Sequence, residues 1–268
     1  TYVFRLSRAS VIDWVGVLFF LGTLLAVTVH GGLRFIAARR QAGQQQRPEV
    51  REVYMYTVYE RFWHWLQMAV ILLLMFTGLI IHKPEMFGIF SFRGVVLVHN
   101  VLAALLVANA ALALFYHLAS GQIKQFLPKP HGFFNAAIEQ AMFYLKGIFE
   151  GAEHPFERTP ERKMNPLQQA TYLAILNVLL PAQIITGALM WAAGRWPGVG
   201  EALGGLPLLA PIHTLVAWLF ASFIVGHVYL TTTGHEPLAS IKGMMFGWDE
   251  VEAPSAQSAQ PAPSSASK

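Results

Sequence analysis

The segment Ile212–Leu238, IHTLVAWLFASFIVGHVYLTTTGHEPL, places two histidines fourteen residues apart in one long apolar run. An α-helix rises about 1.5 Å per residue, so His213 and His227 would lie about 21 Å apart along its axis. At about 100° per residue their directions differ by only about 40°, which puts both on one face. Ionisable side chains inside a bilayer are costly and are functional candidates by default. The segment therefore predicts a membrane helix that serves two sites at different depths.

The composition of the whole chain is that of a multi-pass membrane protein. Its 268 residues are 54% hydrophobic and 13% charged, with a mean hydropathy of +0.44. A soluble domain of this size would carry about a quarter charged residues. Apolar runs of about 20 residues, the length that spans a bilayer, recur along the sequence. We expect five spans, at Val11–Val29, Phe62–Ile81, Val95–His117, Ala170–Ala193 and Leu208–Thr232.

Two segments outside the spans have patterns of their own. Apolar residues recur at helical spacing from Phe133 to Phe149, which predicts a helix at about 132–149 that lies in the membrane interface or packs on a soluble partner. The last segment, VEAPSAQSAQPAPSSASK at 251–268, is rich in Ala, Ser, Pro and Gln, and we predict a disordered tail. The chain opens with Thr1 rather than Met, so we also expect N-terminal processing.

The basic residues predict the orientation. If the N-terminus is outside, five of the 19 lysines and arginines lie on the outer side, which leaves fourteen for the side of the long loop. Cytoplasmic loops carry an excess of Lys and Arg, so we expect the long loop and the C-terminus to be cytoplasmic. The membrane accounts for the basic charge without a nucleic-acid partner. The five outer residues are Arg5, Arg8, Lys83, Arg93 and Arg195.

The absence of cysteine narrows the possible redox chemistry. With no Cys, the chain cannot attach a c-type haem, hold an iron–sulfur cluster through thiolates or build a cysteine zinc site. Histidine, present ten times, is left as the main ligand for a redox metal.

Four histidines lie within spans, at two depths. His64 begins the second span and His227 ends the fifth, both on the side of the long loop, whereas His99 and His213 begin the third and fifth spans on the opposite side. Two histidines at each of two levels are what two bis-histidine haems stacked across a bilayer require. Zinc fits poorly, because two histidines make an incomplete site and the levels are too far apart to share an ion.

We therefore predict an all-α integral membrane fold, with a four-helix haem-binding transmembrane bundle plus one extra N-terminal transmembrane helix. Gly78 and Ala113, fourteen residues after His64 and His99, would give a porphyrin room, although small residues are also common at ordinary helix contacts. The domains would be residues 1–50 (the extra helix, packed on a partner subunit or a neighbouring protomer, and a basic linker), 51–250 (the di-haem four-helix domain) and 251–268 (the tail).

The other histidines rank lower as ligands. His117 lies five full turns after His99, about 27 Å along the same face, and could replace His64 at the inner haem, contact quinone or mark the helix end. His30 and His82 lie at span ends, where polar residues meet the interface. We expect no haem at the loop histidines His131, His154 and His235.

Three segments together resemble a known family. They are YERFWHWLQ (Tyr59–Gln67), LVHN around His99, and the segment quoted first. They are similar to the di-haem cytochrome b subunits of respiratory complexes: the gamma subunit of formate dehydrogenase, the nickel–iron hydrogenase cytochrome b and, most of all, the thiosulfate reductase cytochrome b subunit. The resemblance covers about Tyr56 to Glu250, and it implies a multi-pass protein of the bacterial inner membrane.

The resemblance also implies residue roles. His64 and His227 would ligate the cytoplasmic-side b haem, with His99 and His213 ligating the outer one. Menaquinone or ubiquinone would bind near the inner haem, at a loop that KMNPLQQ (Lys163–Gln169) resembles through Asn165 and Gln168; Leu167 stands where the formate dehydrogenase pattern has glycine. From the sequence alone, Asn165 before Pro166 also fits a helix N-cap.

The predicted function is electron transfer between a quinone pool and a redox partner. Arg61 and Arg93, near His64 and His99, are candidate haem propionate partners, although positive-inside or interfacial anchoring is the favoured explanation for each. The partners implied are an iron–sulfur or multihaem subunit and a periplasmic catalytic subunit, which would carry the substrate-converting site. The alternatives are a stand-alone transmembrane haem-b reductase and a transporter or scaffold with structural histidines.

Overall fold

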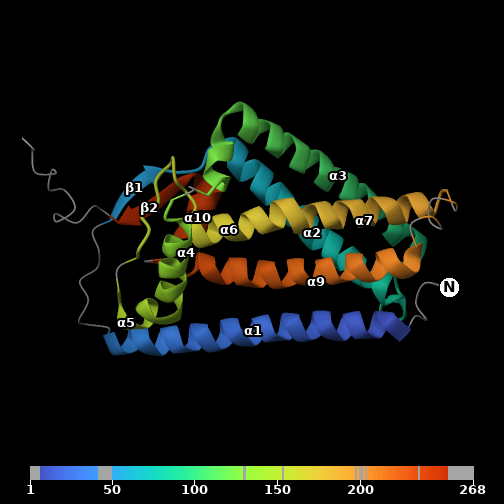
Figure 1. The fold of residues 1–268 in the computed structure, drawn as a ribbon, viewed down its shortest axis with the longest axis horizontal. Helices are drawn as coiled ribbons and strands as arrows, with labels where there is room; N and C mark the ends of the chain where they lie inside the picture. The colour runs from blue at the N-terminus through green and yellow to red at the C-terminus, as the bar shows by residue number, and fades with distance from the viewer. Residues whose placement is uncertain are drawn as a thin grey trace, which may run out of the picture.

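Five long helices, arranged side by side in the computed structural model, make up most of the fold (Figure 1). The structure describes residues 7–41, 50–128, 131–152, 154–196, 198, 202, 204–234 and 236–252. Each of the five is long and apolar enough to cross a membrane. They are α1 (Ser7–Gln41), α2 (Val58–His82), α3 (Phe92–Ala119), the continuous helix from α6 to α7 (Pro166–Ala193) and α9 (Leu206–Thr231). The predicted all-α integral membrane fold is confirmed.

The helix ends agree with the predicted spans to within four residues, with one exception. Helix α1 continues twelve residues past Val29 and ends at Gln41. Nothing in HGGLRFIAARRQ breaks a helix strongly except the paired glycines, and Arg39 and Arg40 in the last turn interact favourably with the helix dipole. The end of the apolar run therefore did not mark the end of the helix.

The fourth span contains a π-helical turn. Helix α6 (Pro166–Ala174) passes through the turn η4 (Ile175–Leu179) into α7 (Leu180–Ala193). Pro181 is the second residue of α7, and a proline inside a helix has no N–H to donate and crowds the preceding turn. A wider turn at this point lets the helix continue through the proline.

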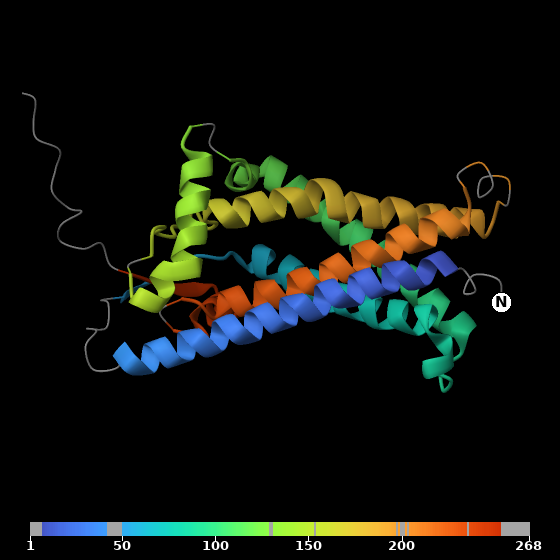
Figure 2. The same ribbon diagram turned by 60° about the horizontal axis from the view of Figure 1, so that its bottom comes forward.

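Most of the short elements gather at one end of the bundle, here called the loop end (Figure 1). Helix α4 (Phe133–Met142), the π-turn η3 (Phe143–Gly147) and α5 (Ile148–Glu150) confirm the helix predicted at 132–149, and α4 runs across the long helices in Figure 2. Its exposed side chains Phe134, Ile138, Met142 and Leu145 form one apolar stripe. The 3₁₀ turn η2 (Gln122–Phe126) follows α3 at the loop end, whereas η1 (Pro84–Met86) follows α2 at the opposite end.

A two-stranded sheet at the loop end was not predicted. Strand β1 (Val50–Tyr54) pairs antiparallel with β2 (Trp248–Glu252), which follows α10 (Ala239–Phe246). Five-residue strands almost 200 positions apart carry no hairpin signal, so only the tertiary fold brings them together. The strand takes in Val251 and Glu252, the first two residues of the predicted tail, and 253–268 lie outside the described residues.

Helix α1 packs along α9 of the same chain, rather than serving only a partner subunit or a neighbouring protomer. Gly16 lies against the Trp218 ring, and Phe20 stacks near the same ring with centroids 5.8 Å apart. Near the loop end, Arg34 donates to the Thr232 carbonyl at 2.6 Å. At the opposite end, the Asp13 carboxylate lies 2.7 Å from His82 Nε2 and 3.0 Å from the Lys83 ammonium, both at the end of α2.

The contact of Gly16 with Trp218 can be tested by adding one methyl group. A Cβ at position 16 would overlap the indole, whereas a Cβ at Gly22 on the same helix meets nothing within 4 Å. We expect Gly16→Ala to destabilise the protein by about 1–3 kcal/mol through overpacking. Gly22→Ala should have no effect or a slight stabilising one, since alanine favours a helix. Thermal unfolding in detergent measures both, and equal behaviour of the two variants would contradict the packing.

Candidate functional site

The structure brings the four membrane histidines together as two pairs. At the loop end, the rings of His64 on α2 and His227 on α9 have centroids 6.3 Å apart. At the opposite end, His99 on α3 and His213 on α9 have centroids 6.5 Å apart. These are the pairs that the depth argument predicts. The pair His64–His227 is called the inner pair below, and His99–His213 the outer pair.

Both separations fit a metal held between two imidazoles. A metal–nitrogen bond is about 2 Å long, and the ring centre lies roughly 1 Å further, so two rings on opposite sides of one metal have centroids about 6 Å apart. The described residues contain no group of three or more His, Cys, Asp or Glu that could hold a metal ion. Each pair therefore suits a metal whose remaining ligands come from its own macrocycle, as in haem.

The outer pair is held by hydrogen bonds that the sequence analysis missed. Thr77 Oγ1 on α2 lies 2.8 Å from His99 Nδ1, and Thr186 Oγ1 on α7 lies 2.9 Å from His213 Nδ1. The amide of Gln183 lies 3.0 Å from His213 Nε2, and metal binding at that nitrogen would replace this contact. The sequence does contain a signal for these hydrogen bonds, because the dipeptide Thr–Gly recurs in the outer half of two spans, at 77–78 and 186–187.

Glycines lie beside the outer rings. A Cβ at Gly78 would be 3.5 Å from His99 Cε1, and a Cβ at Gly187 would be 3.2 Å from His213 Cε1. Gly78 therefore faces the outer site, as its spacing from His64 predicts, and Gly187 has the same place on α7 without having been predicted. Ala113 is buried, and its carbonyl accepts from His117 at 2.7 Å.

The inner pair has a more aromatic setting. Phe223 stacks on His227 with centroids 5.5 Å apart, and the Tyr172 hydroxyl lies 3.3 Å from His227 Nδ1. His64 contacts Trp65 edge-on at 5.3 Å. Its buried Nδ1 has no hydrogen-bond partner among the described residues.

His117 is buried among ring neighbours different from those of His227. Its ring contacts Trp63 and Phe126, with centroids 5.6 and 5.2 Å away, and Nδ1 donates to its own helix. The ring neighbours of His227 in the described chain are instead His64, Tyr172 and Phe223. This geometry favours His64 over His117 as the partner of His227, and the ligand assignment itself stays a prediction.

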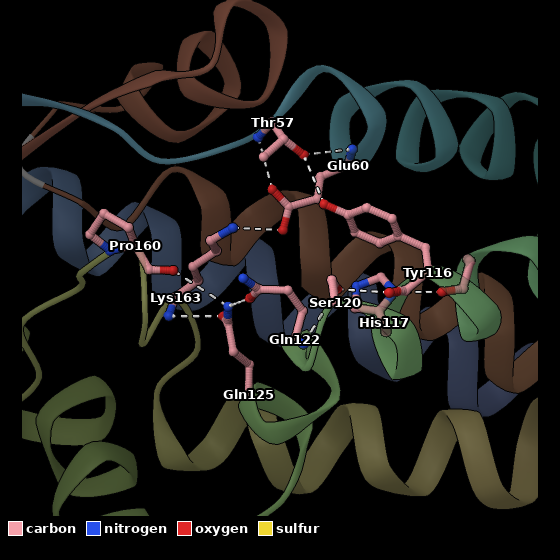
Figure 3. Close-up of polar contacts among 10 residues, drawn as sticks. Thr57, Glu60, Tyr116, His117, Ser120, Gln122, Gln125, Pro160 and Lys163 are labelled. Atoms are coloured by element: carbon pink, nitrogen blue, oxygen red, sulfur yellow. Dashed lines mark hydrogen bonds and ion pairs between the residues drawn. The ribbon is translucent and has the colours of Figure 1, made fainter.

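A buried polar cluster lies near His117 at the loop end (Figure 3). The Lys163 ammonium lies 2.6 Å from the Glu60 carboxylate, and both side chains are 10% exposed. Glu60 also completes a capping box with Thr57 at the start of α2. Gln125 on η2 accepts from the Lys163 backbone N–H at 3.3 Å. The cluster fastens η2 and the segment before α6 to the first turn of α2.

The predicted quinone residues form the N-cap of α6. Asn165 Oδ1 accepts from the Gln168 N–H at 2.8 Å, and Gln168 Oε1 accepts from the Asn165 N–H at 3.0 Å. Asn165 is 4% exposed, and its amide donates to the Tyr144 hydroxyl at 3.4 Å. Burial raises the pKa of Tyr144, so this hydroxyl stays protonated at neutral pH. Capping is thus observed, and a quinone contact would be an additional role.

The two arginines are placed differently. Arg61 Nη1 donates to the Met245 carbonyl at 2.7 Å and so holds α10 against α2. Trp65 Nε1 donates to the neighbouring Met244 carbonyl at 2.9 Å. Arg93 is exposed in the first turn of α3. Anchoring explains both arginines in the described structure, and a propionate contact stays a prediction.

Where the remaining described histidines form hydrogen bonds, their partners are residues other than the four paired histidines. His30 contacts the Tyr229 hydroxyl and lies 2.7 Å from the Tyr144 carbonyl, and His82 is paired with Asp13. His131 is exposed. Burial lowers the pKa of His154, which keeps its ring neutral. His235 lies outside the described residues.

Comparison with known proteins agrees with this geometry. A model of the family "Prokaryotic cytochrome b561" matches residues 55–247, which include all four paired histidines. The chain belongs to the prokaryotic cytochrome b561 family. It is therefore a multi-pass membrane cytochrome that carries haem b and transfers electrons, which confirms the resemblance to membrane cytochromes b.

One curated relative is similar over most of its length. The protein named "Putative cytochrome YdhU" from Escherichia coli (strain K12) is 33% identical over 230 residues, which cover 85% of each chain. No solved structure matches the cytochrome significantly.

The buried ion pair at the loop end gives a second test of the structure. Lys163→Met would leave the Glu60 carboxylate buried without its cation, and breaking such a pair costs about 3–5 kcal/mol. As a control, Lys146→Met removes a cation from an exposed pair with Glu150, and such pairs contribute little. We expect a large fall in thermal stability for the first variant and none for the second. A Lys163→Met protein as stable as its parent would contradict the buried pair.

Proposed function

We propose that this cytochrome carries electrons across the membrane through two b haems, one at each histidine pair. The observation that carries the proposal is the presence of two facing pairs, with ring centroids 6.3 and 6.5 Å apart, on a shared helix α9. Their depths differ by about 21 Å along that helix, which leaves room for two macrocycles with their edges close. Haem, when bound, supplies the reversible one-electron iron couple.

The chain's own residues decide what these haems can do. Two histidines would hold the iron at each site, so a bound haem would supply one-electron transfer rather than oxygen activation. The apolar helices around each pair exclude water, and burial together with the hydrogen bonds of the ligands sets the potentials. The proposed ligands are His64 and His227 at the inner site, and His99 and His213 at the outer site.

We propose that the loop end is cytoplasmic and that quinone reacts there. Excess Lys and Arg on that side supports this orientation in a bacterial inner membrane, with the C-terminus inside. Asn165, Gln168 and the buried His117 are the candidate quinone contacts near the inner pair. The cluster of Glu60 and Lys163 supplies polar groups through which protons can be exchanged with that side when quinone changes redox state.

The outer haem would exchange electrons with a periplasmic-side partner. That partner would be an iron–sulfur or multihaem subunit of a respiratory oxidoreductase complex, whose catalytic subunit converts the substrate. The cytochrome itself would then be the quinone-reactive subunit of the complex.

Haem content tests the two-site proposal directly. We expect the purified chain to hold two b haems, and His213→Ala and His227→Ala each to lose one, since each removes one axial ligand. The double variant should show no b-type bands in a reduced-minus-oxidised spectrum. His131→Ala, at an exposed position, is the control and should keep both.

Variants at His64 and His117 separate the two inner-site assignments. His64→Leu should lose one haem, whereas His117→Leu should keep both; the reverse result would make His117 the ligand. Bands that persist in the His213→Ala/His227→Ala double variant would overturn the proposed haem sites, because other residues would then hold the haem.

The quinone role of Asn165 can be separated from capping. Serine is as good an N-cap as asparagine but lacks the amide, so Asn165→Ser should keep α6 stable and slow haem reduction by quinol. Asn165→Ala should both slow haem reduction by quinol and lower the free energy of unfolding by about 0.5–2 kcal/mol, because it removes the amide and the cap. Stopped-flow reduction by a quinol analogue measures the rate. Wild-type rates in Asn165→Ser would show that the amide does not contact quinone, and reduction by soluble donors alone would favour a stand-alone reductase.

A further inference from the structure

The same dipeptide faces both histidines of the outer pair. Thr77 and Gly78 on α2 lie against His99 of α3, and Thr186 and Gly187 on α7 lie against His213. The hydroxyl–Nδ1 distances are 2.8 and 2.9 Å. The glycine Cβ positions would be 3.5 and 3.2 Å from the corresponding Cε1 atoms. The outer site is thus built from two similar helix pairs, α2 with α3 and α7 with α9.

The direction of each threonine hydrogen bond follows from its second partner. Thr77 Oγ1 lies 2.8 Å from the Leu73 carbonyl, and Thr186 Oγ1 lies 2.6 Å from the Ala182 carbonyl. A carbonyl can only accept, so each hydroxyl donates its proton to its own helix. The hydroxyl oxygen must then accept from the histidine Nδ1–H. Both outer rings are therefore in the Nδ1–H tautomer, with the lone pair on Nε2.

The glycines let the rings adopt this position. Cε1 lies between the two ring nitrogens, so a ring whose Nδ1 reaches the threonine brings Cε1 close to the next residue of the helix. At Gly187 a side chain would be tighter than an ordinary van der Waals contact, and at Gly78 it would just touch. The dipeptide thus combines an acceptor for Nδ1–H with space for the ring.

The inner pair lacks such an arrangement. The Tyr172 hydroxyl lies at the longer distance of 3.3 Å from His227 Nδ1. His64 Nδ1 is buried without a partner in the described chain. The two pairs therefore differ in how firmly their ring orientation and tautomer are fixed, although their ring separations are almost equal.

We propose that Thr77 and Thr186 are positioning residues that fix the outer histidines for metal binding through Nε2 and tune the outer haem alone. The inference rests on the proposed haem sites. A hydrogen bond accepted from the distal N–H of a ligating histidine sets its tautomer and raises its basicity. A more basic ligand stabilises oxidised iron relative to reduced iron. The threonine hydrogen bonds therefore lower the midpoint potential of the outer haem.

Valine at these positions keeps the shape of threonine and removes the acceptor. In a spectroscopic redox titration with two haem transitions, we expect Thr77→Val and Thr186→Val each to raise the midpoint potential of one transition. The midpoint potential of the other transition should not change. The shifted transition should be the one that is missing in His213→Ala. Both variants should also change the low-temperature electron paramagnetic resonance signal of that haem alone, because the ring orientation is freed.

Matched variants separate positioning from general damage. Thr77→Ser and Thr186→Ser keep the hydroxyl and should titrate like the parent. Thr23→Val removes a hydroxyl that also bonds its own helix, to the Phe19 carbonyl at 3.0 Å, but touches neither pair, and it should change nothing. If a valine variant is not recovered folded, Thr186→Ala provides the same loss of acceptor with a smaller side chain.

The outcomes distinguish the proposed haem sites from the positioning role of the two threonines. A parent protein without b-type bands would overturn the proposed haem sites themselves. A parent with two haems, whose valine variants titrate and resonate like the parent, would overturn the positioning role alone. An equal shift of both transitions would also overturn it, since the inner pair has no contact with either threonine in the described structure.

Discussion

The helical period of α9 is the constraint on which the rest of the structure depends. Because one straight helix places His213 and His227 on a single face at two depths, every partner must meet that face at one of two levels. Helix α2 brings His64 to one level, and α3 brings His99 to the other. Trp218 lies about 140° round the helix from His213, so α1 can pack on its ring at the opposite side of α9. The bundle is thus organised around a shared helix, which is also the most buried of the five spans.

Polar groups in the spans show how costly that arrangement is. Inside a bilayer there is no water to hydrogen-bond a polar group, so such a group is stabilised by a partner in the protein. Asn109, 5% exposed, donates to the Gln67 side chain at 2.7 Å and to the Trp63 carbonyl at 3.2 Å. Thr77 and Thr186 bond their own helices and a histidine each. Against this background, His64 Nδ1 has no hydrogen-bond partner among the described residues, which marks the inner pair as the less constrained of the two sites.

At the loop end, charged segments outside the spans are held together across the end of the bundle. Ion pairs between distant segments do this: Lys163 with Glu60, and Arg158 with Asp249 at 3.0 Å. Tyr56 is half-buried near both pairs, and desolvation, with Asp249 and Glu60 nearby, raises the pKa of its hydroxyl. The sheet of β1 and β2 then ties the segment after α1 to the segment after α10.

The sequence alone determined the spans, the depths of the four histidines and their grouping in two levels, since hydropathy and helical period are local properties of a segment. It also placed Gly78 opposite the outer site, through the spacing of fourteen from His64. Only the tertiary structure decided which side chains meet between helices. The hydrogen bonds of Thr77 and Thr186, the place of Gly187 and the packing of Gly16 on Trp218 depend on how helices distant in sequence are rotated against one another. No local pattern encodes that rotation, because it is set by the fit of several helices at once.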